Sequence, residues 1–324
     1  MTTRIVLDCD TGSDDAVAIM AAALHPELEL IAVSTVNGNV ALPNTTENTL
    51  RVLDHIGVKV PVHAGAARPL VRPDFPVPRH ILNADNPDFQ IDYLDLEPST
   101  TEVRPGSAVQ LLIDTFLAPE NDDVVLVALG PLTNVALALI AEPRLAAKIR
   151  KLVIMGGAHV GGNVTPTAEF NFWVDPEAAR AVFSAGIRDI VVIPLDATHS
   201  APLTATDCEE FHALGTPAGT AASALIRHRI EEQLEPETAA VPVHDALCIA
   251  YLVRPDVITA SGSYHVDVET SGDRTLGQMI VDTRPWSTAP VTATVATAAS
   301  AEVFREVLRD AFGNTVRDLR GSTS

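Results

Sequence analysis

Acidic side chains are concentrated near the start of the chain, where the segment DCDTGSDDA holds four carboxylates within eight residues: Asp8, Asp10, Asp14 and Asp15. Gly12 permits a tight turn that could aim several of them at one point. Like charges at short range raise one another's pKa, so the cluster calls for a cation to neutralise it. Ca²⁺ takes about six to eight oxygen ligands from carboxylates, carbonyls and water. The pattern therefore predicts a calcium site.

Two other interpretations of this segment stay open. Asp14 and Asp15 could simply begin a helix, because the helix dipole favours acids in the first turn, although capping needs fewer acids than the segment has. Phosphatases of the haloacid-dehalogenase type also place an Asp-x-Asp pair after their first strand and use Mg²⁺ to hold a phosphate. That alternative leaves the Asp14–Asp15 pair without a role, and the acidic, Lys-poor surroundings suit a phosphate badly.

Short β-branched runs alternate with helical patterns along the chain. The expected strands are Ile5–Leu7, Leu30–Val36, Val60–Gly65, Val124–Leu129, Lys151–Met155 and Asp189–Leu195. The expected helices are Asp14–Leu24, Pro43–Ile56, Gly106–Leu117, Pro131–Glu142 and Pro176–Ala185. This alternation predicts an α/β fold, a single large domain with a mostly parallel central sheet flanked by helices. Ligands of such sheets bind at the carboxyl ends of the strands, which is where the acidic segment begins.

Composition narrows the possible partners. The 324 residues are 47% hydrophobic, enough for a large core, and carry a net charge of -20. That charge argues against nucleic acid as a partner, and no run of about 18 apolar residues predicts a membrane span. A cytoplasmic protein is expected, with one domain over residues 1–312 and a flexible tail over 313–324. The stretch Arg68–Pro105 is rich in Pro and Asp and is expected to be a long insert of loops.

At this point the residues resemble a known family, the inosine–uridine-type nucleoside hydrolases, which are calcium-dependent nucleoside N-ribohydrolases. The acidic segment is similar to that family's DxDxGxDDA signature. Further similar blocks follow in the family's order: TVNGNV (Thr35–Val40), LGPLTNVALAL (Leu129–Leu139), MGGA (Met155–Ala158), GGNVTPTAEFNFWVDPEAA (Gly161–Ala179) and HDALCIAYLV (His244–Val253). Together they span most of the chain, which makes the resemblance specific.

The resemblance implies a role for each matching residue. Ca²⁺ would be held by the carboxylates of Asp10, Asp15 and Asp245 and by the main-chain carbonyl of Leu129, where the family usually has Thr. The ribose of a nucleoside substrate would be bound by Asp14, Asn39, Asn163, Glu169 and Asn171. Phe170, which lies between these polar residues, could line the pocket or pack beneath the loop. Asp10 would orient or deprotonate a metal-bound water, and His244 would protonate the leaving base. A homodimer or homotetramer is also implied.

The residue types agree with this chemistry. Breaking a ribosyl C–N bond builds positive charge on the sugar, which carboxylates and amides stabilise. Ca²⁺ makes a bound water more acidic, and no covalent nucleophile is needed, so the reaction should invert the anomeric carbon. An imidazole with a pKa near neutrality would suit proton donation by His244. A His at that place favours pyrimidine or mixed specificity over strict purine use.

Purely structural roles remain as alternatives for most of these residues. Asn163, Glu169 and Asn171 could be ordinary loop polars, Asn39 could make a turn beside Gly38, and His244 could be structural. The segment Pro78–Gln90 lacks the glycines that the family commonly has there, which leaves base preference and the roles of His80 and Asn83 open. A catalytically silent nucleoside- or ribose-binding protein is therefore a further alternative to hydrolysis.

Overall fold

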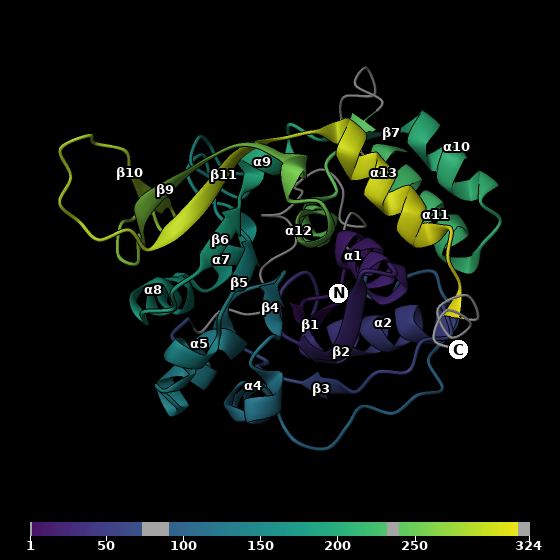
Figure 1. The fold of residues 1–324 in the computed structure, drawn as a ribbon, viewed down its shortest axis with the longest axis horizontal. Coiled ribbons are helices and arrows are strands. Elements are labelled where there is room, and N and C mark those ends of the chain that lie inside the picture. Colours follow the sequence, from purple (N-terminus) through teal and green to yellow (C-terminus); the bar gives the residue numbers. More distant parts are fainter. Residues whose placement is uncertain (1, 73–90, 232–239, 317–324) are drawn as a thin grey trace.

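A nine-stranded sheet forms the centre of the molecule (Figure 1). The computed structural model describes residues 2–72, 91–231 and 240–316. The strand order is β10-β9-β11-β6-β5-β4-β1-β2-β3. All neighbours from β11 to β3 pair in parallel, whereas β9 pairs antiparallel with both β10 and β11. The α/β fold with a mostly parallel sheet is thus confirmed.

The strands of this sheet are β1 (Thr3–Cys9), β2 (Leu28–Thr35), β3 (Val62–Ala64), β4 (Val125–Ala128), β5 (Leu152–Met155), β6 (Ile190–Ile193), β9 (Ile258–Val268), β10 (Met279–Asp282) and β11 (Ala293–Ala299). A separate antiparallel pair is formed by β7 (Leu203–Thr204) and β8 (Ala240–Val241). Each of the six strands expected from the sequence is present. The three strands β9, β10 and β11 were not expected, because β9 and β11 are rich in Ala, Ser and Thr and lack a continuous apolar run.

The α-helices are α1 (Ser13–Leu24), α2 (Leu42–His55), α4 (Ala108–Leu117), α5 (Thr133–Ala141), α6 (Leu145–Lys148), α7 (Phe170–Val174), α8 (Pro176–Ser184), α9 (Leu195–Thr198), α10 (Ala205–Ala213), α11 (Pro217–Glu231), α12 (His244–Val253) and α13 (Ala301–Phe312). Two 3₁₀ turns cover Pro119–Asn121 and Pro255–Val257. Among the described helices, none is both long and apolar enough to cross a bilayer.

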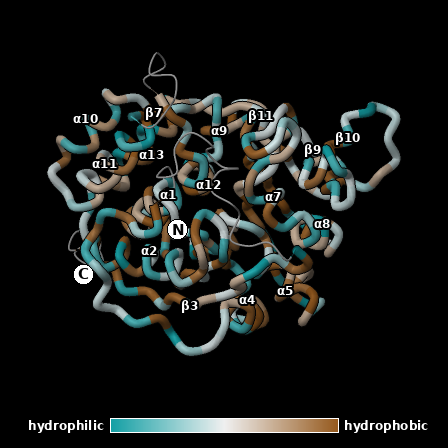
Figure 2. Tube along the Cα trace, turned by 180° about the vertical axis from the view of Figure 1, so that it is seen from behind, coloured by the Kyte–Doolittle hydropathy of each residue, from teal (hydrophilic) through white to brown (hydrophobic). Residues whose placement is uncertain are grey.

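Helices cover both faces of the sheet because its strands are apolar on both sides. In β1, Ile5 and Leu7 belong to the core shared with α1, α2 and α10–α13, whereas Val6 belongs to the core shared with α4, α5, α6 and α8. Hydrophilic and hydrophobic residues are mixed along many of the surrounding helices, as the teal and brown segments in Figure 2 show. In α13, for example, Phe304, Leu308 and Phe312 form a buried stripe at helical spacing.

Helix α1 is an exception, since almost all of its residues are buried. It is enclosed between the sheet and the helices α11, α12 and α13 (Figure 1). Its predominantly alanine, valine and isoleucine sequence therefore packs on every side. This enclosure fixes the acidic segment at its start in the interior of the molecule.

The sheet order reverses between β1 and β4. From β1 the chain adds β2 and β3 on one side, and then returns to add β4, β5 and β6 on the other. A reversal of this kind leaves a crevice beyond the carboxyl ends of the two strands, where ligands of doubly wound sheets bind. Asp8, near the end of β1, pairs in register with Ala128 at the end of β4. The acidic segment and Leu129 therefore emerge side by side at this crevice.

The expected insert Arg68–Pro105 is described only at its ends. Residues 68–72 and 91–105 contain neither helix nor strand, as expected for loops. The segment Pro78–Gln90, in which base contacts were considered, lies outside the described residues.

Candidate active site

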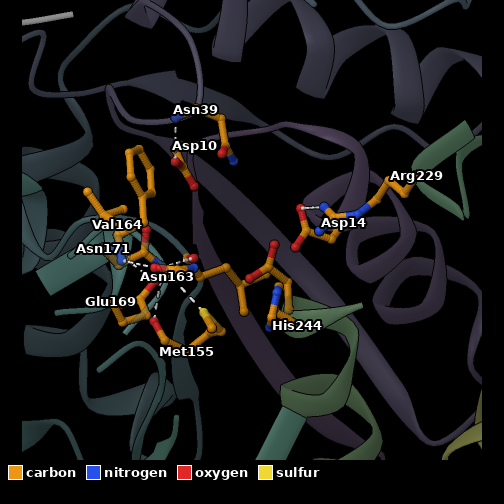
Figure 3. Close-up of a pocket in the computed structure, with 13 residues that line it drawn as sticks. Asp10, Asp14, Asn39, Met155, Asn163, Val164, Glu169, Asn171, Arg229 and His244 are labelled. Atoms are coloured by element: carbon orange, nitrogen blue, oxygen red, sulfur yellow. Dashed lines mark hydrogen bonds and ion pairs between the residues drawn. The ribbon is translucent and has the colours of Figure 1, made fainter. Parts of the chain in front are cut away.

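A cavity of about 220 Å³ opens at the reversal of strand order (Figure 3). It is lined by Asp10, Asp14, Asn39, Leu129, Met155, Asn163, Val164, Glu169, Phe170, Asn171, Arg229, His244 and Asp245. Every residue expected to bind substrate or to take part in catalysis lies on its wall. Of the expected metal ligands, Asp15 is buried immediately behind it.

Asp15 anchors the turn between β1 and α1. Its carboxylate accepts hydrogen bonds from the backbone N–H of Asp10 (3.2 Å) and of Gly12 (3.0 Å), and from the side-chain amide of Asn39 (3.1 Å). Gly12 leaves room for the side chain of Asn39, because a Cβ at position 12 would lie 2.9 Å from its amide nitrogen. The acid thus caps the helix and also holds the turn that presents Asp10 to the cavity. The capping interpretation is correct for Asp15, but it accounts for only part of the cluster.

The loop between β2 and α2, which contains Asn39, fixes the position of the Asp10 carboxylate. Its Oδ2 accepts a 2.7 Å hydrogen bond from the backbone N–H of Asn39. Gly38 and Gly130 pack directly against the Asp10 carboxylate, so that a side chain at either position would displace it. The position of this carboxylate is therefore determined by the backbone on both sides.

Asp8 does not join the other acids. It is fully buried and accepts hydrogen bonds from Ser34 (2.6 Å) and Asn134 (2.7 Å), away from the cavity wall. Burial raises its pKa to about 6, although both hydrogen bonds act in the opposite direction. The same Asn134 amide also donates to the carbonyl of Thr35, so Asp8 ties α5 to the central strands. Three of the four carboxylates of the motif, rather than all four, belong to the site.

Three buried acids come together as a possible cation site. Among the described residues, Asp14, Asp15 and Asp245 have carboxylate oxygens within 4.8 Å of one another. Burial and the neighbouring charge of Asp14 together raise the pKa of Asp15 to about 7. Burial and the neighbouring carboxylates also hold the pKa of Asp245 well above its usual range. Buried, all-oxygen donors whose charges repel one another fit a hard divalent cation.

This group differs in one member from the ligands implied by the family resemblance. Asp14 takes the place of Asp10 in the group of three, while Asp10 lines the same cavity and has a pKa raised well above its usual range by burial and by Asp15. The set Asp10, Asp15 and Asp245 therefore stays a prediction. Calcium binding by variants of Asp10 and Asp14 would distinguish the two sets.

The raised pKa values predict how calcium should stabilise the protein at different pH. Asp15 binds its proton more tightly in the folded chain, so its contribution to stability is lost as the pH rises from about 4 to about 7. Calcium, the cofactor predicted from the sequence, would require the deprotonated acids and would offset this loss. At ~100 times its Kd it adds about 2.7 kcal/mol to the free energy of unfolding, which should raise Tm by several degrees at pH 8 and by much less at pH 5.

Differential scanning calorimetry with and without calcium measures this difference. Asp245→Asn is the matched variant and should abolish the calcium-dependent shift at both pH values. A shift of equal size at pH 5 and pH 8, or one retained in Asp245→Asn, would contradict the assignment of these acids to a cation.

Leu129 lies where the resemblance placed it, at the end of β4. Its carbonyl oxygen accepts a 2.8 Å hydrogen bond from the side-chain amide of Asn171, which also contacts the carbonyl of Met155 at 3.2 Å. A carbonyl oxygen has two lone pairs, so this bond leaves a second one available. A ligand role of this carbonyl, which stays a prediction, would use only the main chain and would therefore tolerate Leu in place of Thr.

Glu169 closes the opposite end of the cavity. It is the N-cap of α7, and its carboxylate accepts hydrogen bonds from the backbone N–H of Asn171 (2.9 Å), Phe172 (3.3 Å) and Gly157 (2.8 Å). Burial raises its pKa to about 7 despite these bonds. The fixed carboxylate joins the loop after β5 to the start of α7.

Asn163 and Phe170 lie beside Glu169. The side-chain oxygen of Asn163 accepts a 3.0 Å hydrogen bond from the backbone N–H of Phe170. The Phe170 ring lines the cavity and also packs against Val174 and Trp173. Asn163 and Glu169 therefore both help to form this wall through backbone bonds, in addition to any contact with a ligand.

His244 begins α12, directly before Asp245. Its Nδ1 lies 2.8 Å from the hydroxyl of Thr198, and its ring packs near that of His199. Burial lowers its pKa to about 3, with the positive charges of Arg229 and His199 adding to the effect and Asp14 opposing it. This value differs from the near-neutral pKa expected from the sequence, because the sequence does not show that the ring is partly buried.

Arg229, in the last turn of α11, was not among the expected site residues. Its Nη1 forms a 3.1 Å ion pair with Asp14 and donates a 3.2 Å hydrogen bond to Ser13. A lone Arg near the end of a helix carries no motif, and only the packing of α11 against α1 brings it to the acidic segment. The cavity wall therefore includes a positively charged side chain that was not among the site residues expected from the sequence.

Comparisons with known proteins identify the family. The sequence model of the inosine-uridine preferring nucleoside hydrolases matches residues 5–306. The pyrimidine-specific ribonucleoside hydrolase RihB of Escherichia coli is 39% identical over 282 residues, which are 86% of this chain and 87% of that protein.

Solved structures show the same relationship. A purine-preferring ribonucleoside hydrolase from Gardnerella vaginalis superimposes with a TM-score of 0.85 at 29% identity, covering 96% of this chain and 98% of that one. An inosine–guanosine nucleoside hydrolase gives 0.84 at 29% identity, with 97% and 99% covered. The chain therefore belongs to the inosine-uridine preferring nucleoside hydrolase family.

Proposed function

We propose that this protein hydrolyses the N-glycosidic bond of ribonucleosides to give ribose and the free base, with pyrimidine or mixed specificity. The observation that carries the proposal is the cavity itself. Its wall combines Asp10, Asp14 and Asp245 with the amides of Asn39, Asn163 and Asn171 at the reversal of strand order. The pyrimidine-specific name of the 39% identical Escherichia coli relative supports the preference.

The side chains can carry out this reaction in clearly separated roles. Asp14 and the amides would bind the ribose hydroxyls, and Asp10 would orient a water molecule and accept its proton. The remaining carboxylates would stabilise the positive charge that develops on the sugar as the bond breaks. Because water attacks directly, the product should have the inverted anomeric configuration.

Calcium is the cofactor that we propose for this site. Asp15 and Asp245 would hold it together with Asp10 or Asp14 and the carbonyl of Leu129. When bound, such an ion makes a water molecule more acidic and neutralises the buried carboxylates. The support is the group of buried acids and their raised pKa values.

The alternatives are weaker on the same observations. A phosphate would meet the carboxylates of Asp10, Asp14, Glu169 and Asp245 on the cavity wall, and Arg229 is already paired with Asp14. A silent binding protein has no need of a carboxylate fixed as firmly as Asp10, which is enclosed by two glycines.

A substrate panel with the calcium-loaded enzyme tests the proposal. Uridine, inosine and p-nitrophenyl phosphate are incubated separately, and reducing sugar and inorganic phosphate are measured. We expect reducing sugar from the nucleosides, no phosphate, and loss of turnover after chelation. Release of phosphate would indicate the phosphatase, whereas binding of uridine without any product would indicate the silent binding protein.

Quaternary structure and location stay predictions from the sequence. A homodimer or homotetramer is expected, and light scattering of the purified protein measures it directly. No feature of the described residues tests the predicted cytoplasmic location.

A further inference from the structure

Arg229 supplies a positive charge to a cavity that otherwise presents acids and amides. Among the described residues of the cavity wall, it is the one whose side chain is positively charged at every physiological pH. Its side chain is 12% exposed and that of its partner Asp14 is 10% exposed. An ion pair this shielded from water is an unusual feature beside a reaction that builds positive charge on the sugar, and it calls for an explanation.

The location of Arg229 indicates which part of a substrate it would meet. Figure 3 shows Arg229, Asp14 and His244 at one end of the cavity, with Glu169 and Asn171 at the other. Under the proposed function, on which this inference rests, Asp14, Glu169 and the amides bind the ribose along the cavity, and His244, which the family resemblance assigns to the leaving base, lies beside the base. Arg229 then lies at the base end, next to the bond that breaks.

We propose that Arg229 is a further catalytic residue, whose guanidinium donates a hydrogen bond to the carbonyl oxygen of the departing pyrimidine. As the glycosidic bond breaks, its electron pair moves onto the base nitrogen and is shared with the adjacent carbonyl oxygen. Water adds its oxygen to the anomeric carbon and gives a proton to Asp10, and the base takes up a proton from solvent. Arg229 keeps its own protons and stabilises the negative charge.

The hydrogen bonding of His244 explains why the departing base needs another hydrogen-bond donor. When the hydroxyl of Thr198 donates to the carbonyl of Leu195 at 3.3 Å, its 2.8 Å contact with His244 is made by an N–H on Nδ1. The neutral ring then has no proton on its other nitrogen and can only accept a hydrogen bond there. Arg229 supplies the donor that this tautomer of His244 lacks.

The chemistry of the bases makes the effect selective. In uridine and cytidine the nitrogen of the broken bond is bonded to a ring carbon that carries a carbonyl oxygen. In purine nucleosides the corresponding nitrogen lies between two ring carbons without oxygen. Arg229 should therefore assist pyrimidines more than purines, which connects a named residue of this chain with base preference.

Kinetics of matched variants test the assignment. The values of kcat and KM for uridine, inosine and p-nitrophenyl β-D-ribofuranoside are measured for the calcium-loaded wild type, Arg229→Met and Arg229→Lys. Arg227→Met is the control, since Arg227 lies on the same helix near Cys208 and is not part of the cavity wall. The leaving group of the nitrophenyl substrate is a stable phenolate, which departs without a hydrogen bond or a proton from the enzyme.

We expect Arg229→Met to lower kcat for uridine by ~10²-fold, the loss typical of one electrostatic donor. Inosine should be affected less, and the nitrophenyl substrate by no more than a few-fold, which also shows that the variant is folded. Arg229→Lys should recover part of the uridine activity, and Arg227→Met should behave as wild type.

Two results would overturn the inference while leaving the proposed function intact. Equal losses on all three substrates would show that Arg229 acts through Asp14 and the ribose, and unchanged uridine turnover would show that it has no role in the reaction. A wild-type enzyme that cleaves none of the three would overturn the proposed function together with the inference.

Discussion

Asp10→Asn is expected to lower kcat for uridine by ~10²–10⁴-fold with little change in KM. Asparagine has nearly the same shape and can still accept the hydrogen bond from the Asn39 N–H, so the pocket should keep its form. Its amide cannot take a proton from water, which is the role proposed for the carboxylate. The loss should therefore fall on the chemical step, which steady-state kinetics with uridine measures.

Calcium binding and a surface variant complete this test. Asp114→Asn, on the exposed side of α4, is the same substitution away from the site and should leave activity unchanged. Isothermal titration with calcium should give a weaker Kd for Asp10→Asn if Asp10 is a ligand, and an unchanged Kd if Asp14 takes that place. A rise in KM at constant kcat would show that Asp10 only binds substrate.

Gly38→Ala should reduce turnover almost as strongly without touching any polar group. A Cβ at this position would lie 2.5 Å from the Cγ of Asp10 and 2.6 Å from its Cβ, closer than real Cβ atoms approach their neighbours. The short, buried Asp10 side chain must then move away from its hydrogen bond to Asn39. Misplacement of a reacting group by about 1 Å can cost ~10²-fold in rate, and overpacking costs about 1–3 kcal/mol in stability.

A double-mutant cycle shows whether the loss passes through Asp10. Gly38→Ala should add little to the defect of Asp10→Asn, because the group that it displaces is already inactive. Gly313→Ala is the matched control: Gly313 ends α13 with a φ of -70°, and its nearest neighbour is a backbone oxygen at 3.3 Å. Additive losses in the double variant would mean that Gly38 acts on the site by another route.

The fold was predictable wherever burial on both faces leaves a continuous apolar run. β1, β4, β5 and β6 carry such runs and were identified directly. β9 and β11 were not, because they lie toward one edge of the sheet and their small, partly polar residues give no comparable signal. The order of the strands in the sheet could not be predicted from the apolar pattern of the sequence, although this order decides which strand ends meet at the cavity.

The site was predictable where its residues belong to compact motifs. Asp10, Asp14 and Asp15 share one turn, and Glu169 and Asn171 share another, so each group could be matched to a motif of the family that the chain resembles. The divergence of Asp8 from the cavity, the burial of His244 and the contribution of Arg229 all depend on packing between distant segments. Such contacts leave no local pattern, and for that reason the tertiary structure was needed to find them.

Proton NMR of uridine with the calcium-loaded enzyme in phosphate-free buffer tests the central claim most directly. The proposed reaction predicts that uracil and ribose appear in equal amounts, and that α-ribose forms first because water attacks the face opposite the β-linked base. Slow mutarotation to the equilibrium mixture should follow. Unchanged uridine at full calcium loading, or uracil accompanied by initial β-ribose, would contradict direct hydrolysis by an oriented water molecule.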